Sequence, residues 1–414
     1  MFGNVARSRL LPMSLPFRYF GAAAAFQLGA WALLLFFPAE LVNFEIGLGP
    51  VFAALHLLTL GVLAMSAIGA TLQLLPVATR QPVSALWAVR LQWWLFVPGT
   101  VLFAGAGAAY RPDLLGAGAM AIVFSLLLYG ILLFRNLLGA RGMRVVVAHG
   151  WAALACLVAL AATGLALVGR YEHGWAIDHQ ALRTAHLVLA TFGFMGLLAI
   201  GLSGFLLPML AVAPPPPQRV AYAVLGLALA GIVMASLGWT LPGALAGLGA
   251  ALLHVGAMER SLRARLRPRL EPSFLLVRVS WGCLIACLAL AALGFPGGPL
   301  LFVIALVPGW LLTFLLGVLA RIVPFLASVH ASSSDRGTPI IAALTPARLL
   351  AAHRLLHLAA LALLVAAALT GQAVLAAAGA ACGLASAALF SAFFVFVLCK
   401  VRHGIQPPHQ PAAA

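Results

Sequence analysis

The sequence predicts an all-α integral membrane protein, and two features of its composition carry that prediction. Of the 414 residues, 64% are apolar and only 8% are charged, and the mean hydropathy is +1.11. An ordinary soluble domain carries roughly a quarter charged residues. Because one membrane crossing takes ~20 apolar residues, the chain has room for roughly a dozen spans and for no sizeable domain outside the bilayer.

Apolar runs bounded by proline, glycine and charge predict twelve transmembrane helices in a single transmembrane domain over 1–414. No small-residue cleavage site follows the first run, so we expect a first span there and not a cleaved signal peptide. The predicted spans are 17–37, 50–76, 84–107, 113–134, 146–169, 181–209, 219–240, 243–259, 273–295, 298–326, 343–370 and 373–399.

The arginines are distributed unevenly between the two sides of the predicted bundle. Nearly all lie at the termini or between an even-numbered and the next odd-numbered span, and only Arg111, Arg170 and Arg183 lie on the other side. The positive-inside rule then predicts cytoplasmic N- and C-termini for a multi-pass protein of a bacterial-type inner (plasma) membrane. Topology thus explains the net charge of +16, and we expect the lipid bilayer, not nucleic acid, as the partner.

All eight acidic residues fall in predicted loops or at predicted helix ends. Carriers coupled to protons or sodium usually place a carboxylate at membrane depth. The sequence therefore disfavours a coupled transporter, although a carrier for a neutral solute needs no such group.

A repeated motif, G-x7-G-x6-P, recurs at every fourth predicted span. Glycines eight residues apart lie near one helical face, where a neighbouring helix or a flat ligand can come close, and we expect each proline to end its helix. The motif predicts three parallel four-helix repeats, about 17–135, 146–262 and 273–400, related by an axis along the membrane normal. Its residues are Gly61, Gly69 and Pro76, then Gly193, Gly201 and Pro208, then Gly309, Gly317 and Pro324.

A second internal similarity has the same period. The segment HGWAALACLVALAATG from His149 matches VSWGCLIACLALAALG from Val279. This match pairs Trp151 with Trp281 and, within one residue, Cys156 with Cys287. These four residues are therefore predicted to occupy corresponding positions in the second and third repeats.

Twelve helices in three parallel arcs of four, with a histidine near the outer start of the second span, resemble subunit I of the heme-copper oxidase superfamily. The motif H-L-L-T-L-G-x7-G-x6-P from His56 is similar to the divergent single-subunit branch, which includes NnrS-type heme and copper proteins linked to nitric oxide tolerance. The resemblance implies a pseudo-threefold fold and a heme of undetermined type, with copper as a further cofactor. It also implies electron transfer or the binding of NO or O2, and respiratory or electron-donor proteins as partners.

The sequence departs from the family at the copper site. Members that reduce O2 or NO carry histidines on helix 6, a pair near helix 7 and an H-x-H on helix 10. Here the sixth span has His186, the seventh has none, and His330 is predicted to lie in the loop after the tenth. The resemblance therefore implies heme binding without the full set of catalytic copper-site histidines. No catalytic residue is assigned; any enzymatic activity would be that of an oxidoreductase similar to heme-copper oxidases or nitric oxide reductases.

Two histidines are the main candidates for cofactor and metal ligands. An imidazole in hydrocarbon is costly unless paired or ligated, and neutral imidazole is a common ligand of heme iron and copper. His56 and His186 begin spans that run in the same direction and lie at similar depths. Arg183 is the predicted partner of heme propionates, and Gly61 and Gly193 offer an open face to a flat cofactor. The alternative for each histidine is a hydrogen bond to a neighbouring helix.

Other histidines give weaker candidates. His353 and His357 are four residues apart, so one helical face presents both rings and they can share a metal ion. The arginines around them favour instead a partly wet helix end. His149 or His254 would be the ligand of a second heme on the inner side.

Three functions therefore remain open from the sequence. The preferred one is a heme-binding membrane protein of the heme-copper oxidase-like fold that lacks the full set of catalytic copper-site histidines and acts in electron transfer or in NO or O2 binding or tolerance. The second is a channel or carrier for a small neutral solute, a metal or heme. The third is a noncatalytic assembly or scaffold subunit of a respiratory complex.

Overall fold

The computed structural model describes residues 11–43, 47–83, 85–294, 298–331 and 341–403. Every regular element in these ranges is helical, and twelve of the resulting helical spans are long and apolar enough to cross a membrane. All twelve predicted spans are confirmed, with ends that differ from the prediction by a few residues. The chain is therefore an all-helical, multi-pass membrane protein.

Nine spans are built around one long helix each. The fourth span begins with the short 3-10 helix η2 (Pro112–Leu114), and α3 (Pro38–Val42) and η5 (Ile341–Leu344) lie between spans. The nine helices are α2 (Ser14–Phe36), α6 (Leu86–Ala108), α7 (Leu115–Leu138), α8 (Arg144–His173), α11 (Gln218–Ser236), α12 (Thr240–Arg263), α13 (Phe274–Leu293), α16 (Ala347–Thr370) and α17 (Ala373–His403).

The second, sixth and tenth spans each consist of three consecutive helical segments. The middle segment is a π-helix, a rare form with a wider turn that is often found at functional sites. The segments are α4 (Pro50–His56), η1 (Leu57–Ala64) and α5 (Met65–Thr79); α9 (His179–Val188), η3 (Leu189–Gly196) and α10 (Leu197–Ala211); and α14 (Gly298–Ile304), η4 (Ala305–Leu312) and α15 (Thr313–Ala331).

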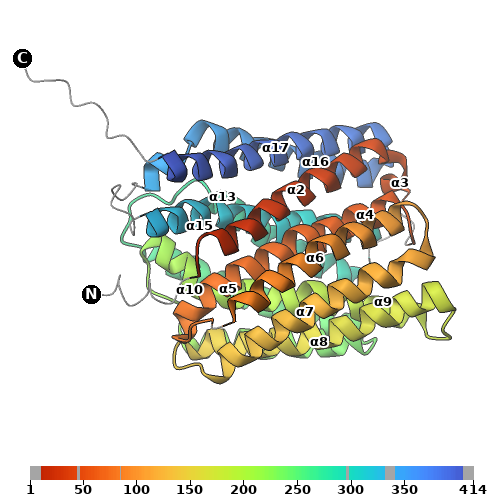
Figure 1. Ribbon diagram of the computed structural model, residues 1–414, viewed down its shortest axis with the longest axis horizontal. Helices are drawn as coiled ribbons and strands as arrows, with labels where there is room; N and C mark the ends of the chain where they lie inside the picture. The colour runs from red at the N-terminus through yellow and green to blue at the C-terminus, as the bar shows by residue number, and fades with distance from the viewer. Residues whose placement is uncertain (1–10, 44–46, 84, 295–297, 332–340, 404–414) are drawn as a thin grey trace, which may run out of the picture.

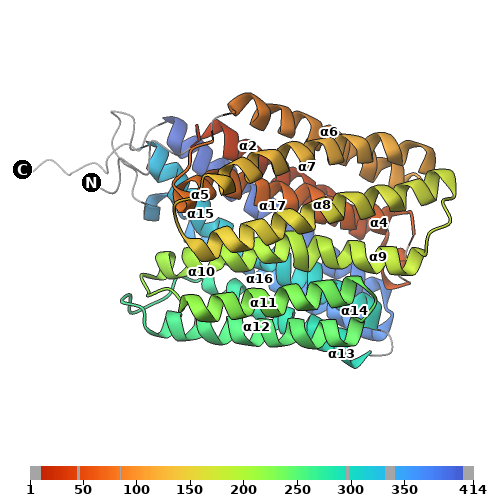
Figure 2. The same cartoon turned by 90° about the horizontal axis from the view of Figure 1, so that it is seen from below.

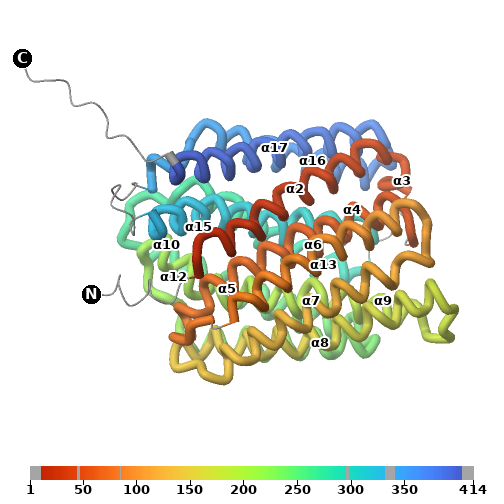
Figure 3. The backbone as a smooth tube through the Cα atoms, in the orientation of Figure 1, coloured from red at the N-terminus to blue at the C-terminus, as the bar shows by residue number. Residues whose placement is uncertain are grey.

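The spans run side by side along the long axis of the molecule (Figures 1 and 2). The start of α2 and the end of α17 lie at the same end of the bundle, on the left of Figure 3, which we call the terminal end. The other end, where α2 ends and α4 and α9 begin, is called the opposite end.

The three spans that contain π-helices form the centre of the bundle. Their most apolar windows are 61%, 61% and 67% buried, against 22–44% for the other nine spans. The segment η4 contacts both η1 and η3. Large apolar side chains such as Phe124, Leu355 and Val374 are exposed on the outer helices, as a surrounding lipid phase requires. The core is therefore built from the spans that carry the repeated glycine motif.

Each π-helix is eight residues long and has the first glycine of the motif, Gly61, Gly193 or Gly309, at its fifth position. A Cβ atom at these glycines would lie 2.6, 2.9 and 3.0 Å from a side-chain atom of the preceding span. The neighbouring side chains are Phe26, Cys156 and Cys283, respectively. The glycines therefore permit close approach of two helices, one of the two roles that the motif predicts.

The prediction that the prolines end their helices is wrong. Helices α5 and α10 continue for three residues beyond Pro76 and Pro208, and α15 continues for seven beyond Pro324, so that His330 is helical and not in a loop. A proline removes one backbone donor, and helices of membrane proteins tolerate that loss where neighbouring groups compensate for it. The helix ends come instead at Arg80 and Val212, which adopt the left-handed conformation.

Three carboxylates at the opposite end cap the starts of even-numbered spans. Glu40 Oε1 accepts a hydrogen bond of 2.9 Å from Val51 N in α4, and Glu172 Oε1 accepts one of 2.6 Å from Gly116 N in α7. Asp178 Oδ1 accepts from two backbone amides at the start of α9, at 3.0 and 3.1 Å. A negative charge stabilises a helix N-terminus, so these acids have structural roles.

Replacing Asp178 by alanine is expected to loosen the first turn of α9. Loss of an N-cap costs about 1 kcal/mol, which corresponds to roughly fivefold faster amide exchange. Hydrogen-exchange mass spectrometry of the segment around Gln180 measures this change in the amide exchange rate. Asp113→Ala is the control, because Asp113 pairs with the exposed Arg111 and not with α9. Equal exchange in the two variants contradicts the capping role.

Candidate functional site

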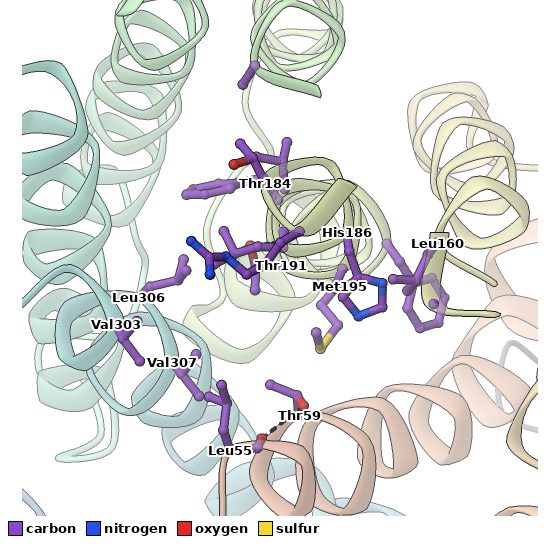
Figure 4. A pocket seen from close by; sticks show the side chains of 18 of the residues that line it. Leu55, Thr59, Leu160, Thr184, His186, Thr191, Met195, Val303, Leu306 and Val307 are labelled. Carbon is purple, nitrogen blue, oxygen red and sulfur yellow. Dashed lines mark hydrogen bonds between the residues drawn. The ribbon is translucent and has the colours of Figure 1, made fainter. Parts of the chain in front are cut away.

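His56 and His186 line the same cavity, which lies in the half of the bundle nearer the opposite end. Its volume is about 490 Å³, within the range of roughly 300–1,000 Å³ typical of small-molecule and cofactor sites. The walls come from the second to the tenth spans and are almost entirely apolar. Figure 4 shows residues of α4, η1, α9, η3, α14 and η4 around this space.

His56 is the last residue of α4, immediately before the π-helix η1. Its Nδ1 lies 2.9 Å from the carbonyl oxygen of Phe52, and its ring packs against those of Phe52 and Phe103, at centroid distances of 4.1 and 5.2 Å. A carbonyl oxygen can only accept, so Nδ1 carries the proton. The lone pair of His56 is therefore on Nε2.

His186 projects from α9 towards Leu160 of α8 (Figure 4). Its Nδ1 lies 3.4 Å from the hydroxyl of Thr163, which itself donates to the backbone carbonyl oxygens of Ala159 and Leu160. Because the hydroxyl proton is used in this way, Nδ1 of His186 is the donor and Nε2 carries the lone pair. A Cβ atom on Gly164 would lie 3.2 Å from the imidazole Cε1, so glycine leaves room for the ring.

The two imidazoles come from different spans, His56 from α4 and His186 from α9. Both rings hold their Nδ1 protons in hydrogen bonds within the protein and keep an Nε2 lone pair. The same tautomer recurs in histidines that ligate metals, whose second nitrogen usually donates to a carbonyl or another acceptor. The structure therefore places both predicted ligands on one cavity.

The polar part of the cavity wall lies near the start of α9. Arg183, His179 and Thr184 line it there, and the Arg183 guanidinium donates a hydrogen bond to Gln180 Oε1. Among the described residues, no carboxylate forms an ion pair with Arg183. A role of Arg183 towards heme propionates stays a prediction.

Gly61 and Gly193 do not line the cavity. Phe26 fills the space beside Gly61, and Cys156 fills the space beside Gly193. The prediction that these glycines contact a flat cofactor is therefore not supported, because packing against a neighbouring helix occupies their open faces.

His353 and His357 lie away from this cavity, deep between spans. Their relative exposures are 1% and 0%, so the expected partly wet helix end is wrong for these two side chains. The reason is that α17 and the middle of the tenth span cover this face of α16. His353 Nδ1 donates to the carbonyl oxygen of Ser386 at 3.0 Å, and His357 Nε2 lies 2.7 Å from the hydroxyl oxygen of Thr313.

These contacts give His353 and His357 a packing role. The ring centroids lie 6.3 Å apart, and one nitrogen of each ring has no hydrogen-bond partner, namely His353 Nε2 and His357 Nδ1. Across the described part of the chain, no group of three or more His, Cys, Asp or Glu side chains could hold a metal ion. A metal shared by this pair stays a prediction that would rest on two ligands.

His149 and His254 lie together in the half of the bundle nearer the terminal end. His149 Nδ1 donates to the carbonyl oxygen of Val145 at 2.9 Å, and His254 Nε2 lies 3.4 Å from the hydroxyl of Ser203. A cavity beside His254 has a volume of about 10 Å³, room for about one water molecule. This volume is far below the roughly 300–1,000 Å³ of typical cofactor sites, and a second heme on the inner side stays a prediction.

Several residues of the cavity were not identified from the sequence. Phe52 and Phe103 surround His56, and the rings of Phe192 and Trp310 stack at 5.4 Å. Small residues from α11 and α12 form a further part of the wall, which is described below. Their spacing of three and four residues along α11 is the signal that marks a small-residue helix face. No pattern in the sequence distinguishes the aromatic residues of the cavity from those of the core.

A scan against protein-family models finds no match, and a search of the curated proteins finds none either.

Proposed function

We propose that this protein binds heme in the cavity, with His56 and His186 as the candidate iron ligands. One observation carries the proposal. Two imidazoles from separate spans line one apolar cavity of cofactor size, and each keeps an Nε2 lone pair while its Nδ1 is held by the protein. An unligated imidazole in such surroundings is costly.

The other residues of the cavity have distinct roles in this proposal. Phe52 and Phe103 fix the orientation of His56 and exclude water from it. Arg183 pairs with propionate carboxylates at the rim through charge-assisted hydrogen bonds. When bound, heme supplies one-electron chemistry and an iron site for NO or O2. Electron transfer, or the binding of one of these gases, is thus the proposed activity.

The proposal concerns heme alone. A copper centre like that of the reducing members of the resembling family needs at least three histidine ligands, and the described residues bring no such group together. Copper therefore stays an implication of the resemblance and has no assigned site. Reduction of O2 or NO is not part of the proposed activity.

We also propose the three parallel four-helix repeats, about 17–135, 146–262 and 273–400, and a fold like that of heme-copper oxidase subunit I. Three π-helices of equal length, each with the first glycine of the motif at its fifth position, support the three repeats. In addition, Trp151 and Trp281 each pack their ring against the last span of the preceding repeat. The partners of the two rings are Phe134 and His254, respectively.

One residue pairing between the repeats needs correction. Cys156 packs against Gly193, and Cys283 makes the same contact with Gly309. In the proposed repeats, Cys283 rather than Cys287 therefore takes the position of Cys156 beside the motif glycine. The two cysteines are four residues apart, about one helical turn.

Heme content is the test of the proposed function. Protein purified from heme-sufficient cells is expected to contain about one heme per chain in a pyridine hemochromogen assay, if both histidines serve a single iron. Two hemes per chain would mean that each histidine ligates its own iron. Heme-free protein contradicts the proposal and favours the carrier or scaffold function.

The cytoplasmic location of the terminal end is a further proposal, based on the arginine distribution. Alkaline phosphatase, which is active only outside the cytoplasm, is expected to be active when fused after Trp175 and inactive when fused after Arg265. These two sites lie at opposite ends of the bundle. The phosphatase activity of colonies that express each fusion shows which site lies outside the cytoplasm. The reverse pattern of activity contradicts the proposed orientation.

A further inference from the structure

The cavity extends around α9 to a second side that has no histidine ligand. Helix α9 packs between α8 and α11. In Figure 4, Thr184 and Leu306 lie on the other side of α9 from Leu160. We call this second part of the cavity the small-residue lobe. Its wall includes Ala228, Gly231, Ala235, Gly243, Ala244, Gly247, Ala250 and Ala251, together with Trp310.

The length of the small-residue lobe matches one leaflet of a bilayer. Its wall on α12 extends from Thr240, the first residue of that helix, to Ala251. At 1.5 Å per residue, this distance is about 16 Å. The hydrocarbon core of a bilayer is ~30 Å thick, so the lobe covers about half of it. It therefore reaches from the opposite end to near the middle of the bundle.

The wall of the lobe is apolar along most of this length. At its inner end lies the stacked pair Phe192 and Trp310. The hydroxyl of Thr191 donates to the carbonyl oxygen of Leu187 at 2.8 Å, so its proton is already used within the helix. Further hydroxyl groups, those of Thr184 and Thr240, line the cavity near the opposite end. A fitting ligand is thus apolar over its length and polar only at the membrane surface.

The outer wall of the lobe is a helical hairpin that packs tightly on itself. A Cβ atom on Gly231 would lie 2.8 Å from the carbonyl oxygen of Gly243, so α11 and α12 are in backbone contact. Helix α11 is also the least buried of the twelve spans, with 22% of its window buried. The hairpin of α11 and α12 therefore lies between the lobe and the surrounding lipid.

We infer that the small-residue lobe binds one linear hydrocarbon chain of a membrane-soluble amphiphile, with the polar head at the opposite end. The chain is an acyl chain of a lipid or the isoprenoid chain of a quinone. Both have a slender apolar shape that fits an apolar wall on which alanines such as Ala228, Ala244 and Ala250 present short side chains. This inference uses none of the heme ligands and goes beyond the proposed function.

The test replaces a residue of the lobe wall by phenylalanine and measures how much amphiphile the purified protein retains. Ala228 lines the cavity, whereas Ala230, two residues along α11, is exposed on the outer face. Wild type and Ala230→Phe are expected to retain about one chain-bearing molecule per protein after exhaustive washing in detergent. Ala228→Phe is expected to lose roughly 90% of it, because the phenyl ring occupies the space. Mass spectrometry of the solvent extract identifies a lipid or a quinone.

A second variant distinguishes filling of the lobe from a folding defect. Ala244→Phe fills the lobe from α12 and is expected to cause the same loss. Size-exclusion chromatography and the thermal midpoint show whether each variant is folded. A wild type without a stoichiometric amphiphile overturns the inference. So does equal retention by folded Ala228→Phe and Ala230→Phe. Neither result bears on heme.

Discussion

Replacing His186 by alanine is expected to abolish stable heme binding. The variant loses an axial ligand, and the other histidine of α9 that lines the cavity, His179, lies seven residues away at the first residue of the helix. The Soret absorbance per protein is expected to fall to roughly a tenth of the wild-type value or below, because each ~1.4 kcal/mol of lost binding free energy weakens heme affinity tenfold and the loss of an axial ligand costs several such steps. His56→Ala is expected to have a comparable effect.

His353→Ala is the control, because His353 is also a histidine of a membrane span, is more deeply buried than His186, and lies outside the cavity. It removes the hydrogen bond to Ser386 and is expected to lower the thermal midpoint while heme content stays unchanged. Heme retained in full by the double variant His56→Ala/His186→Ala would exclude both histidines as ligands.

Replacing Gly201 by leucine is expected to be the most destabilising single change among the motif glycines. A Cβ atom there would lie 2.5 Å from the Cβ of His149, so the sixth span cannot approach α8 without a backbone shift. Overpacking of this kind costs ~1–3 kcal/mol and occasionally more. Thermal unfolding in detergent, followed by circular dichroism, measures the loss.

Gly204→Leu is the control on the same helix. No heavy atom lies within 4 Å of the position where its Cβ would be, so leucine there meets open space. This variant is expected to unfold within about a degree or two of wild type, as for a surface change within ±0.5 kcal/mol. An equal loss in both variants would show that the close contact with His149 does not determine stability.

The spans could be predicted because hydrophobic length is a local property of the sequence. All twelve apolar runs became helices, from Ser14–Phe36 to Ala373–Arg402. The π-helices could not be predicted in this way, since in a span that is apolar on every side the periodicity does not distinguish a turn of 3.6 residues from a wider one. The glycines marked the position of these segments but not their conformation.

The same limit applies to the prediction of the candidate site, because the sequence does not show how distant parts of the chain pack around a side chain. Membrane depth and repeat position selected His56 and His186, and the structure places both on one cavity. The environment of His353 and His357 was misjudged because it depends on how other spans pack against α16: α17 supplies Ser386 and the tenth span supplies Thr313. The faces of Gly61 and Gly193 were likewise ambiguous, since a glycine accepts a helix or a ligand equally well.

The central claim is that the cavity holds heme. The most direct test is the dithionite-reduced minus oxidised optical spectrum of the detergent-purified protein from heme-sufficient cells, with His56→Ala/His186→Ala purified in parallel. A Soret difference band in wild type that is absent from the folded double variant is the predicted result. A featureless wild-type spectrum, or the same band in both proteins, would contradict the claim.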